Sequence, residues 1–273
     1  MLESTMHLES ILACAIKYAR SAGEALANRP DVLQIATKST ETDVVTQMDH
    51  LAEQIIVAGI QADFPEDGIM GEEGADVESL SGYQWVIDPL DGTINYLYGL
   101  PAWAVSIARV NLSEQATQVG VVYAPQLDRL YFASAGSGAF LNESRTRLAV
   151  GQCADLGQAL VGTGFGYDST RRAGQARVLT HVLPQVRDIR RIGSCALDLC
   201  FVAEGLLDAF FERGVNAWDH AAGALVAREA GAIVSGIRGQ KESPDMLLVT
   251  NEYLHQDLGQ ILEYAEADSD QRN

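Results

Sequence analysis

Hydrophobic residues recur along this 273-residue chain with two different periods. Apolar residues three and four positions apart predict helices, whose approximate ranges are 5–27, 46–62, 171–182, 194–203, 218–229 and 251–264. Short apolar runs between turn residues predict strands at about 32–36, 83–87, 105–110, 119–123, 130–133, 139–141, 147–150, 159–162, 186–192, 207–211, 233–234 and 247–250. Strands dominate the middle of the chain, whereas helices and strands alternate in its second half.

The pattern contains no internal repeat and no linker between the two halves. We therefore expect a single domain over residues 1–264, built from two lobes at about 1–150 and 151–264 that share an interface. The last segment, residues 265–273, is polar and is expected to be a disordered tail.

The most unusual segment is WVIDPLDGTINY, residues 85–96. Its apolar start predicts a buried strand, and Asp88 and Asp91 follow where that strand should end. Pro89 cannot continue the hydrogen-bonding ladder, and Thr93 can open a helix. Carboxylates bind hard cations, and the free N–H groups of a helix start bind phosphate, so the segment predicts a site that joins a metal to a phosphate. Asp, Pro and Gly are also common turn formers, which leaves a purely structural turn as the alternative.

Three other segments place acids at the ends of predicted elements. Glu72 and Glu73 follow a short apolar strand, and they should point to opposite sides if the strand continues, so at most one should join a site. Asp49 fits a capping box with Thr46, and Asp219 lies at a helix start where an acid is favoured, so both have structural explanations as well.

Composition narrows the classes of partner. The formal net charge is −18, from 37 acidic and 19 basic residues, which argues against nucleic acid and anionic membranes as main partners. The four cysteines show no metal-ligand or redox spacing, no signal pattern opens the chain, and no apolar run approaches the roughly 20 residues of a membrane span. We expect a cytoplasmic protein. A glycine-rich run at 162–166 lacks the G-x-G-x-x-G spacing, so a dinucleotide site is not favoured.

The segment at 85–96, together with WDHAAG at 218–223, the upstream GEE at 71–73 and K-x-x-x-x-D-V-V-T-x-x-D at 38–49, resembles the inositol monophosphatase family. The resemblance covers nearly the whole chain. It implies an α+β layered fold, an αβαβα sandwich of the sugar-phosphatase type, and it implies a homodimer.

The resemblance also implies roles for individual residues. The metal ligands would be Glu72, Asp88, Asp91, Asp219 and the backbone carbonyl of Leu90. Asp49 and Thr93 would orient the attacking water, with Glu72 as a further catalytic residue. The substrate would contact Asp91, Gly92, Thr93, Ser194, Cys195, Glu212 and Asp219, although Cys195 stands where a smaller residue such as Ala is usual. Lys38 and Asp43 would belong to a supporting loop.

The chemistry of four clustered acids agrees with this assignment. Two carboxylates ~4 Å apart repel by about 4 kcal/mol at an effective dielectric constant of ~20, so the cluster must bind cations or protons. Two or three Mg²⁺ ions would polarise the phosphate and hold a water for direct in-line attack. The resemblance implies a Li⁺-sensitive phosphatase of small polyol or sugar phosphates, with myo-inositol monophosphate as first choice. Fructose 1,6-bisphosphate and histidinol phosphate stay open as substrates. A binding role toward a protein of the transcription machinery is the alternative of another class.

Overall fold

The computed structural model describes residues 2–142 and 144–269, with side chains from residue 8 onward. The α-helices are α1 (Leu2–Ala27), α2 (Gln47–Asp63), α3 (Thr93–Tyr98), α4 (Ser169–Val182), α5 (Cys195–Glu204), α6 (Ala217–Glu229) and α7 (His255–Tyr264). The strands are β1 (Ile35–Thr37), β2 (Val44–Thr46), β3 (Gly68–Gly71), β4 (Asp76–Val77), β5 (Tyr83–Asp91), β6 (Ala104–Asn111), β7 (Ala116–Ala124), β8 (Arg129–Ser134), β9 (Gly138–Leu141), β10 (Thr146–Arg147), β11 (Leu160–Thr163), β12 (Asp188–Arg190), β13 (Ala209–Glu212), β14 (Ile233–Ser235) and β15 (Leu247–Thr250).

The first large sheet has eight strands in the order β10-β9-β8-β7-β6-β5-β3-β4. Neighbouring strands are antiparallel, except that β3 and β5 run parallel. Successive side chains of β5 enter opposite faces: Trp85 and Ile87 join the core under α1 and α2, whereas Val86 joins the core under α5 and α6. Because both faces are covered, this strand is apolar without alternation, as its sequence indicates.

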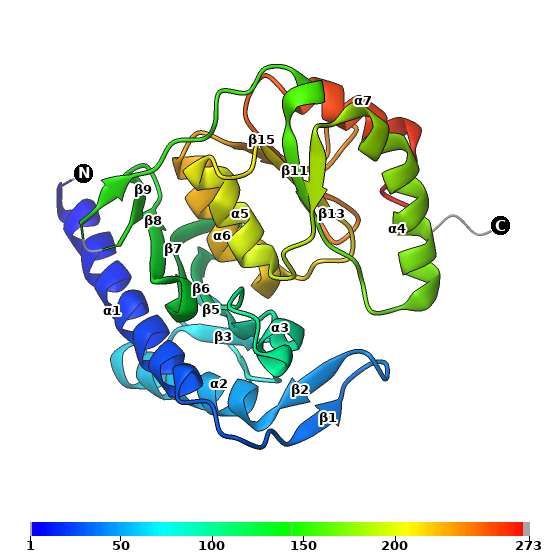
Figure 1. Ribbon diagram of the computed structural model, residues 1–273. Helices are drawn as coiled ribbons and strands as arrows, with labels where there is room; N and C mark the ends of the chain where they lie inside the picture. The colour runs from blue at the N-terminus through cyan, green and yellow to red at the C-terminus, as the bar shows by residue number, and fades with distance from the viewer. Residues whose placement is uncertain (1, 143, 270–273) are drawn as a thin grey trace.

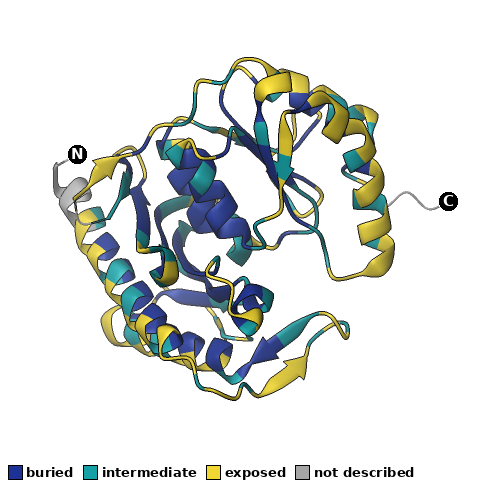
Figure 2. Cartoon of the chain, in the orientation of Figure 1, coloured by how far each residue is buried: buried dark blue, intermediate teal, exposed yellow. Residues whose placement is uncertain are grey.

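The second sheet has five strands in the order β12-β11-β13-β15-β14. Its inner face shares a core with α5 and α6, and its outer face is covered by α4 and α7. The elements therefore stack as helices, sheet, helices, sheet, helices, which confirms the predicted αβαβα sandwich (Figure 1). The central α5 is dark along its length in Figure 2, because eight of its ten residues are buried.

Most predicted elements are present, and the differences lie at their ends. The strand expected at 83–87 continues as β5 to Asp91, and the helix expected at 251–264 begins as α7 at His255. The strand expected at 32–36 begins only at Ile35, and the strand expected at 147–150 is reduced to β10 at Thr146–Arg147. Each of these strands pairs on one side with a neighbour, so the reach of that neighbour sets its length. The two-lobe division stays a prediction, since α5 and α6 come from the second half but pack against the sheet of the first.

The predicted disordered tail needs correction where it is described. Residues 265–269 form turns, Ala267 is buried in the core beneath α4 and α7, and Asp268 accepts a hydrogen bond from Arg238 Nε at 3.0 Å. The segment is mostly polar, so its sequence does not indicate that Ala267 is buried in the core. Residues 270–273 of the predicted tail lie outside the described residues.

Candidate active site

A cavity of about 420 Å³ opens between the two sheets. Its walls come from the β1–β2 loop, the turn after β3, the end of β5, the β11–α4 loop, and the starts of α5 and α6. The residues predicted for the site that line it are Lys38, Asp43, Glu72, Asp91, Ser194, Cys195, Glu212 and Asp219. The structure thus brings together segments that are far apart in the sequence.

The other predicted residues lie behind this wall. Asp49, Asp88 and Leu90 are 0%, 1% and 1% exposed, and Thr93 is 8% exposed. Asp88 and Leu90 lie in β5, which continues through Pro89 to Asp91, whereas Asp49 comes from α2 and Thr93 from the start of α3. The pairing of β5 with β6 shifts register between Asp88 and Asp91, which is where the missing N–H of proline interrupts the ladder.

Four carboxylates share one electrostatic environment. Burial raises the pKa of Asp88 well above its usual range, and the charges of Glu72, Asp91 and Asp219 raise it further. Burial, followed by the charges of Glu72 and Asp91, has the same effect on the pKa of Asp219. Burial raises the pKa of Asp91 to about 6, although hydrogen bonds from Ser194 and Ala196 oppose the shift. A cation or protons must compensate this cluster.

The described residues contain no group of three or more His, Cys, Asp or Glu side chains already arranged around one metal position. Two of the acids are held by other donors instead. Glu72 accepts a hydrogen bond from Lys38 Nζ at 2.8 Å, and Asp91 Oδ2 accepts from Ser194 Oγ at 2.6 Å. The oxygen-only donor set and its mutual repulsion nevertheless suit a hard divalent cation such as Mg²⁺.

Lys38 contacts both of the paired glutamates. Glu72 and Glu73 were expected to point to opposite sides only if the strand continued, and that condition is not met, because β3 ends at Gly71 and the chain turns. Lys38 Nζ therefore reaches both, at 2.8 Å from Glu72 and 2.6 Å from Glu73. Asp43, the other supporting-loop residue, accepts a hydrogen bond from Ser39 Oγ at 2.5 Å and orders the loop.

Asp49 is both a helix cap and a part of the site. Its Oδ2 accepts the Thr46 backbone N–H at 2.9 Å, which completes the predicted capping box at the start of α2. Its Oδ1 faces the other way and accepts Thr93 Oγ1 at 3.0 Å. Thr93 Oγ1 also lies 3.1 Å from the carbonyl oxygen of Leu90.

Asp219 is likewise a helix cap, since its Oδ2 accepts the Asn216 N–H at 2.6 Å at the start of α6. The structural and the functional interpretations of these acids are therefore compatible.

The backbone after β5 is shaped by one glycine. Gly92 has a φ of +95°, and a Cβ at this position would lie 3.0 Å from the carbonyl oxygen of Ala102. The turn leads into α3, which starts at Thr93 and has no side chain capping its first amides. Those N–H groups remain available to an anion.

The start of α5 forms the opposite wall. Ser194 is its N-cap, and the Ala196 N–H donates to Asp91 Oδ2 at 2.7 Å. Burial raises the pKa of the Cys195 thiol well above its ordinary value, so this cysteine stays protonated and is a poor nucleophile.

Glu212 ends β13 beside this wall. A Cβ on Gly164 would lie 2.0 Å from a carboxylate oxygen of Glu212, so the glycine of the neighbouring β11–α4 loop makes room for the acid. Burial raises the pKa of Glu212 to about 8; the charge of Arg191 acts in the opposite direction, and that of Asp91 adds to the increase. The cavity has an acidic, hydrogen-bond-accepting end here.

Sequence reasoning missed Asp198, Arg191 and Tyr167, which also line the cavity. Asp198 is 1% exposed, and its Oδ1 has no hydrogen-bond partner among the described residues. The available signal was a single acid inside the apolar helical run of α5. Nothing in the sequence pairs that acid with Glu212, whose charge raises the pKa of Asp198 after burial itself.

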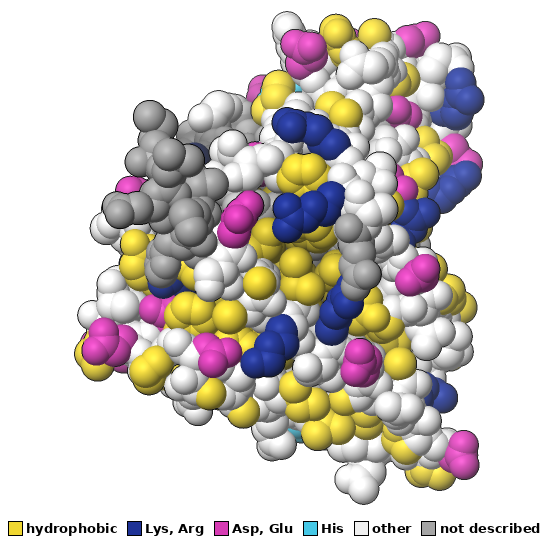
Figure 3. Space-filling model, turned by 90° about the vertical axis from the view of Figure 1, so that its left-hand side faces the viewer, with side chains coloured by type: hydrophobic (Ala, Val, Ile, Leu, Met, Phe, Trp, Pro, Cys, Tyr) yellow, Lys and Arg dark blue, Asp and Glu magenta, His cyan; other side chains and the backbone are white. Residues whose placement is uncertain are grey.

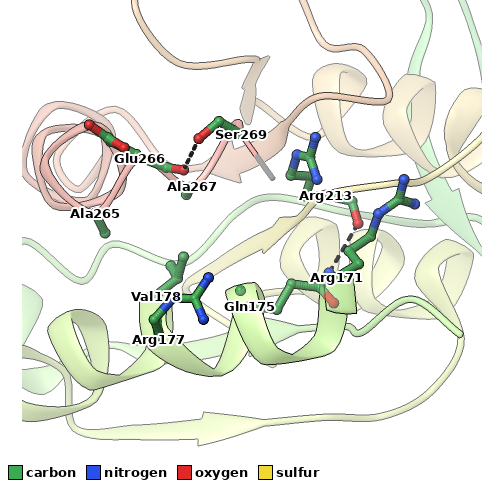
Figure 4. Close-up of a pocket in the computed structure, with 10 residues that line it drawn as sticks. Arg171, Gln175, Arg177, Val178, Arg213, Ala265, Glu266, Ala267 and Ser269 are labelled. Atoms are coloured by element: carbon green, nitrogen blue, oxygen red, sulfur yellow. Dashed lines mark hydrogen bonds between the residues drawn. The ribbon is translucent and has the colours of Figure 1, made fainter. Parts of the chain in front are cut away.

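A second, much smaller cavity of about 20 Å³ lies between α4 and the C-terminal turns (Figure 4). Gln175 Nε2 donates to the carbonyl oxygen of Arg213 across one end of it, at 3.1 Å. It is too small for a substrate and contains none of the predicted site residues. No helix among the described residues combines the length and the apolar composition needed to cross a bilayer.

Comparison with known proteins gives a consistent picture. The model of the "Inositol monophosphatase family" matches residues 7–268. The inositol-1-monophosphatase of Mycobacterium bovis is 47% identical over 209 residues, which cover 73% of this chain and 71% of that protein. The Nus factor SuhB of Pasteurella multocida is 43% identical over 238 residues, which cover 85% of this chain and 87% of that protein.

Solved structures agree. The extragenic suppressor protein SuhB of Bartonella henselae superposes with a TM-score of 0.87 at 33% identity, covering 93% of this chain and 98% of that chain. The inositol monophosphatase of Anabaena (Nostoc) gives a TM-score of 0.83 at 33% identity, covering 94% of this chain and 97% of that chain.

Proposed function

Because the chain belongs to the inositol monophosphatase family, we propose that it is a Mg²⁺-dependent phosphatase that hydrolyses a phosphate monoester of a small polyol or sugar. Relatives named inositol-1-monophosphatase favour myo-inositol monophosphate as the first substrate to test. The observation that carries the proposal is the cluster of Glu72, Asp88, Asp91 and Asp219, whose buried members cannot all be ionised without a cation.

The cluster suggests which residues would hold the metal. Glu72, Asp88, Asp91, Asp219 and the carbonyl of Leu90 offer only hard oxygen ligands, and we propose two or three Mg²⁺ ions for the site. Bound Mg²⁺ would neutralise the acids, polarise the phosphate and stabilise the leaving alkoxide. Lys38 would then exchange its bond to Glu72 for another partner.

Asp49 and Thr93 would orient and deprotonate the attacking water. Thr93 Oγ1 already donates to Asp49 Oδ1 at 3.0 Å, so its lone pairs are free to accept a proton from a water on the cavity side. The proton would pass to Thr93 Oγ1 while the original hydroxyl proton moves to Asp49 Oδ1. The backbone N–H groups of Gly92, which precedes α3, and of Thr93, its first residue, would receive the phosphate oxygens. Attack is direct, and no side chain is phosphorylated.

The leaving group would lie toward Glu212 and the backbone of Ser194 and Cys195. Glu212 accepts hydrogen bonds, and a polyol or sugar supplies hydroxyl donors. This end of the cavity favours a hydroxyl-rich leaving group over one that offers only acceptors.

Phosphate release from a panel of substrates tests the proposal. The panel is myo-inositol monophosphate, fructose 1,6-bisphosphate and histidinol phosphate, each with Mg²⁺ and with a chelator. We expect release that requires Mg²⁺, is inhibited by Li⁺ at millimolar order, and is fastest with the inositol ester. Fastest release from either other substrate would keep the phosphatase class and replace the preferred substrate. No Mg²⁺-dependent release from any of the three would refute the proposal.

The relatives named Nus factor SuhB favour a second candidate, binding to a protein of the transcription machinery. On the face shown in Figure 3, Lys and Arg side chains are interspersed with hydrophobic and acidic ones, which suits a protein partner better than RNA. Binding of purified bacterial RNA polymerase by wild-type protein and by a catalytically inactive variant would test it. Binding that survives inactivation supports a separate role, and the absence of binding refutes it. We also propose a homodimer, which sedimentation equilibrium would test.

A further inference from the structure

Glu53 is a buried acid next to the site that the proposed mechanism does not use. It lies on α2 one turn beyond Asp49 and is only 8% exposed. Its Oε2 accepts the backbone N–H of Glu73 at 3.0 Å, and its Oε1 accepts the backbone N–H of Ala75 at 3.2 Å. One carboxylate therefore uses both of its oxygens on a single short turn.

That turn carries Glu72. The Gly71 N–H closes it by donating to the Ala75 carbonyl at 2.7 Å, and the Glu72 N–H donates to the Ile87 carbonyl of β5 at 3.2 Å. The sheet fixes the start of the turn, and Glu53 fixes its far side. Without Glu53, the backbone N–H groups of the half-buried Glu73 and Ala75 would lose their acceptor, and the turn would have to move toward another partner or toward water.

Gly71 is shaped to admit this carboxylate. A Cβ at Gly71 would lie 2.3 Å from Glu53 Oε2, a distance that no real contact allows. The glycine has no left-handed backbone angle to explain it. Its small size therefore serves the close approach of Glu53 to the turn.

We infer that Glu53 is a positioning residue for the metal site, which holds the turn so that the Glu72 carboxylate is presented to the cation. This inference rests on the proposed function. Since α2 also carries Asp49, one rigid helix would fix both the residue that orients the water and the turn that supplies a metal ligand. Groups that orient metal ligands typically change metal affinity about 10- to 100-fold when they are removed.

The test is the Mg²⁺ affinity of Glu53→Gln, measured by calorimetry on the full chain without substrate. Gln keeps the size of the side chain but turns an NH₂ donor toward one of the two backbone N–H groups. We expect the Kd for Mg²⁺ to rise about 10-fold. In activity assays, the turnover number should recover to within about 2-fold of wild type at saturating Mg²⁺, because Glu53 touches neither the water nor the phosphate.

Glu229 provides a matched control. Its carboxylate also accepts two backbone N–H groups of a turn, those of Gly136 and Gly138 at 2.7 Å each, but that turn joins β8 to β9 and does not line the cavity. Glu229→Gln should lower the unfolding temperature to a similar extent and leave the Kd for Mg²⁺ unchanged. A purely structural role for Glu53 would make the two variants behave alike.

Gly71→Ala supplies an independent route, because its new Cβ displaces the Glu53 carboxylate while keeping the acid. It should weaken Mg²⁺ binding as Glu53→Gln does, and the double variant should weaken it less than the product of the two single effects. If Glu53→Gln fails to fold, the Kd for Mg²⁺ of Gly71→Ala alone tests the inference. Wild-type Mg²⁺ affinity in either folded variant would overturn the inference. Failure of the wild-type protein to bind Mg²⁺ would instead count against the proposed function.

Discussion

Two buried aspartates, Asp67 just before β3 and Asp88 within β5, are surrounded by opposite kinds of neighbour. Asp67 is 6% exposed and accepts hydrogen bonds from Arg109 Nε at 2.8 Å, Trp85 Nε1 at 3.0 Å and Ser81 Oγ at 2.6 Å. Asp88 is 1% exposed and accepts the backbone N–H of Leu90 at 3.0 Å. Its charged neighbours are acids.

The difference separates an acid that completes the fold from one that we propose as a metal ligand. Removing an ion from water costs several kcal/mol, and Arg109 offsets that cost at Asp67 by charge and by direct hydrogen bonding. No described cation does the same for Asp88. The fold therefore holds Asp88 in a state that protons or a bound metal must stabilise, and this is the property expected of a metal ligand.

The largest effect is expected for Asp88→Asn. This change should lower kcat/KM on the order of 10³-fold, because it removes a proposed metal ligand and part of the negative charge that would attract the cation. Unlike most core substitutions, it should raise the metal-free free energy of unfolding, since it relieves repulsion with Glu72, Asp91 and Asp219. Phosphate-release kinetics and urea unfolding in a chelator measure the two quantities. A destabilised variant with near-normal turnover would show that Asp88 is a structural acid after all.

The opposite outcome is expected for Asp67→Asn. The change removes the charge that balances the buried Arg109. The free energy of unfolding should therefore fall by about 3 kcal/mol. At temperatures where the variant is folded, kcat/KM should stay close to that of wild type, because Asp67 lies outside the cavity. Activity lost at full folding would mean that Asp67 also acts on the site.

The sequence distinguishes these two aspartates only through their local motifs. Asp88 was predicted as a ligand because Pro89 and Asp91 follow it in a recognisable motif, although the strand predicted to end before Asp88 continues to Asp91. The role of Asp67 depends on Arg109, which is 42 residues away and lies on another strand. The role of Glu53 is hidden in the same way. Its carboxylate oxygens accept hydrogen bonds from a turn, and the periodicity of the sequence does not show that this turn lies beside α2.

The layer order followed from the family resemblance, and the starts of α2 and α6 were predicted to within one residue. The capping boxes at Thr46 and Asn216 depend on residues three apart, so local chemistry fixed the starts of α2 and α6. Strand ends were less predictable, because β10 stops where its pairing with β9 stops. The direction of Glu73 could not be predicted either, since it depends on a turn that begins where β3 ends.

A change of pH should have a moderate effect on the free energy of unfolding. It tests the side of the contrast that Asp88 represents, in which buried acids have other acids as neighbours. The pKa of Asp91 is raised to about 6 and that of Glu212 to about 8, above the values of about 4 that both have in an unfolded chain. The folded state thus binds more protons than the unfolded state, so stability is present at low pH and is lost as pH rises toward 8. In a chelator, these two groups should lower the free energy of unfolding by roughly 2–3 kcal/mol between pH 6 and pH 8. Urea unfolding at both pH values measures it, and a rise instead would contradict the charge assignment.

Mg²⁺ should reverse that loss, because the bound cation favours the ionised acids and releases their protons. Calorimetric titration in buffers of different ionisation enthalpy measures the number of protons released. Proton release at pH 7 that disappears in Asp88→Asn would tie the effect to the cluster.

The smallest effect is expected for Glu212→Gln, and it asks whether an acid at the cavity rim serves the fold or the substrate. Gly164 leaves room for this carboxylate, which lines the cavity. Gln retains one acceptor oxygen, so the KM for myo-inositol monophosphate should rise only a few-fold, on the order of one weakened hydrogen bond. An aryl phosphate lacks the hydroxyl donors, and its KM should barely change. Equal increases in KM for both esters would indicate that Glu212, like Asp67, serves the fold. An increase in KM for the inositol ester alone would indicate that Glu212, like Asp88, serves the site.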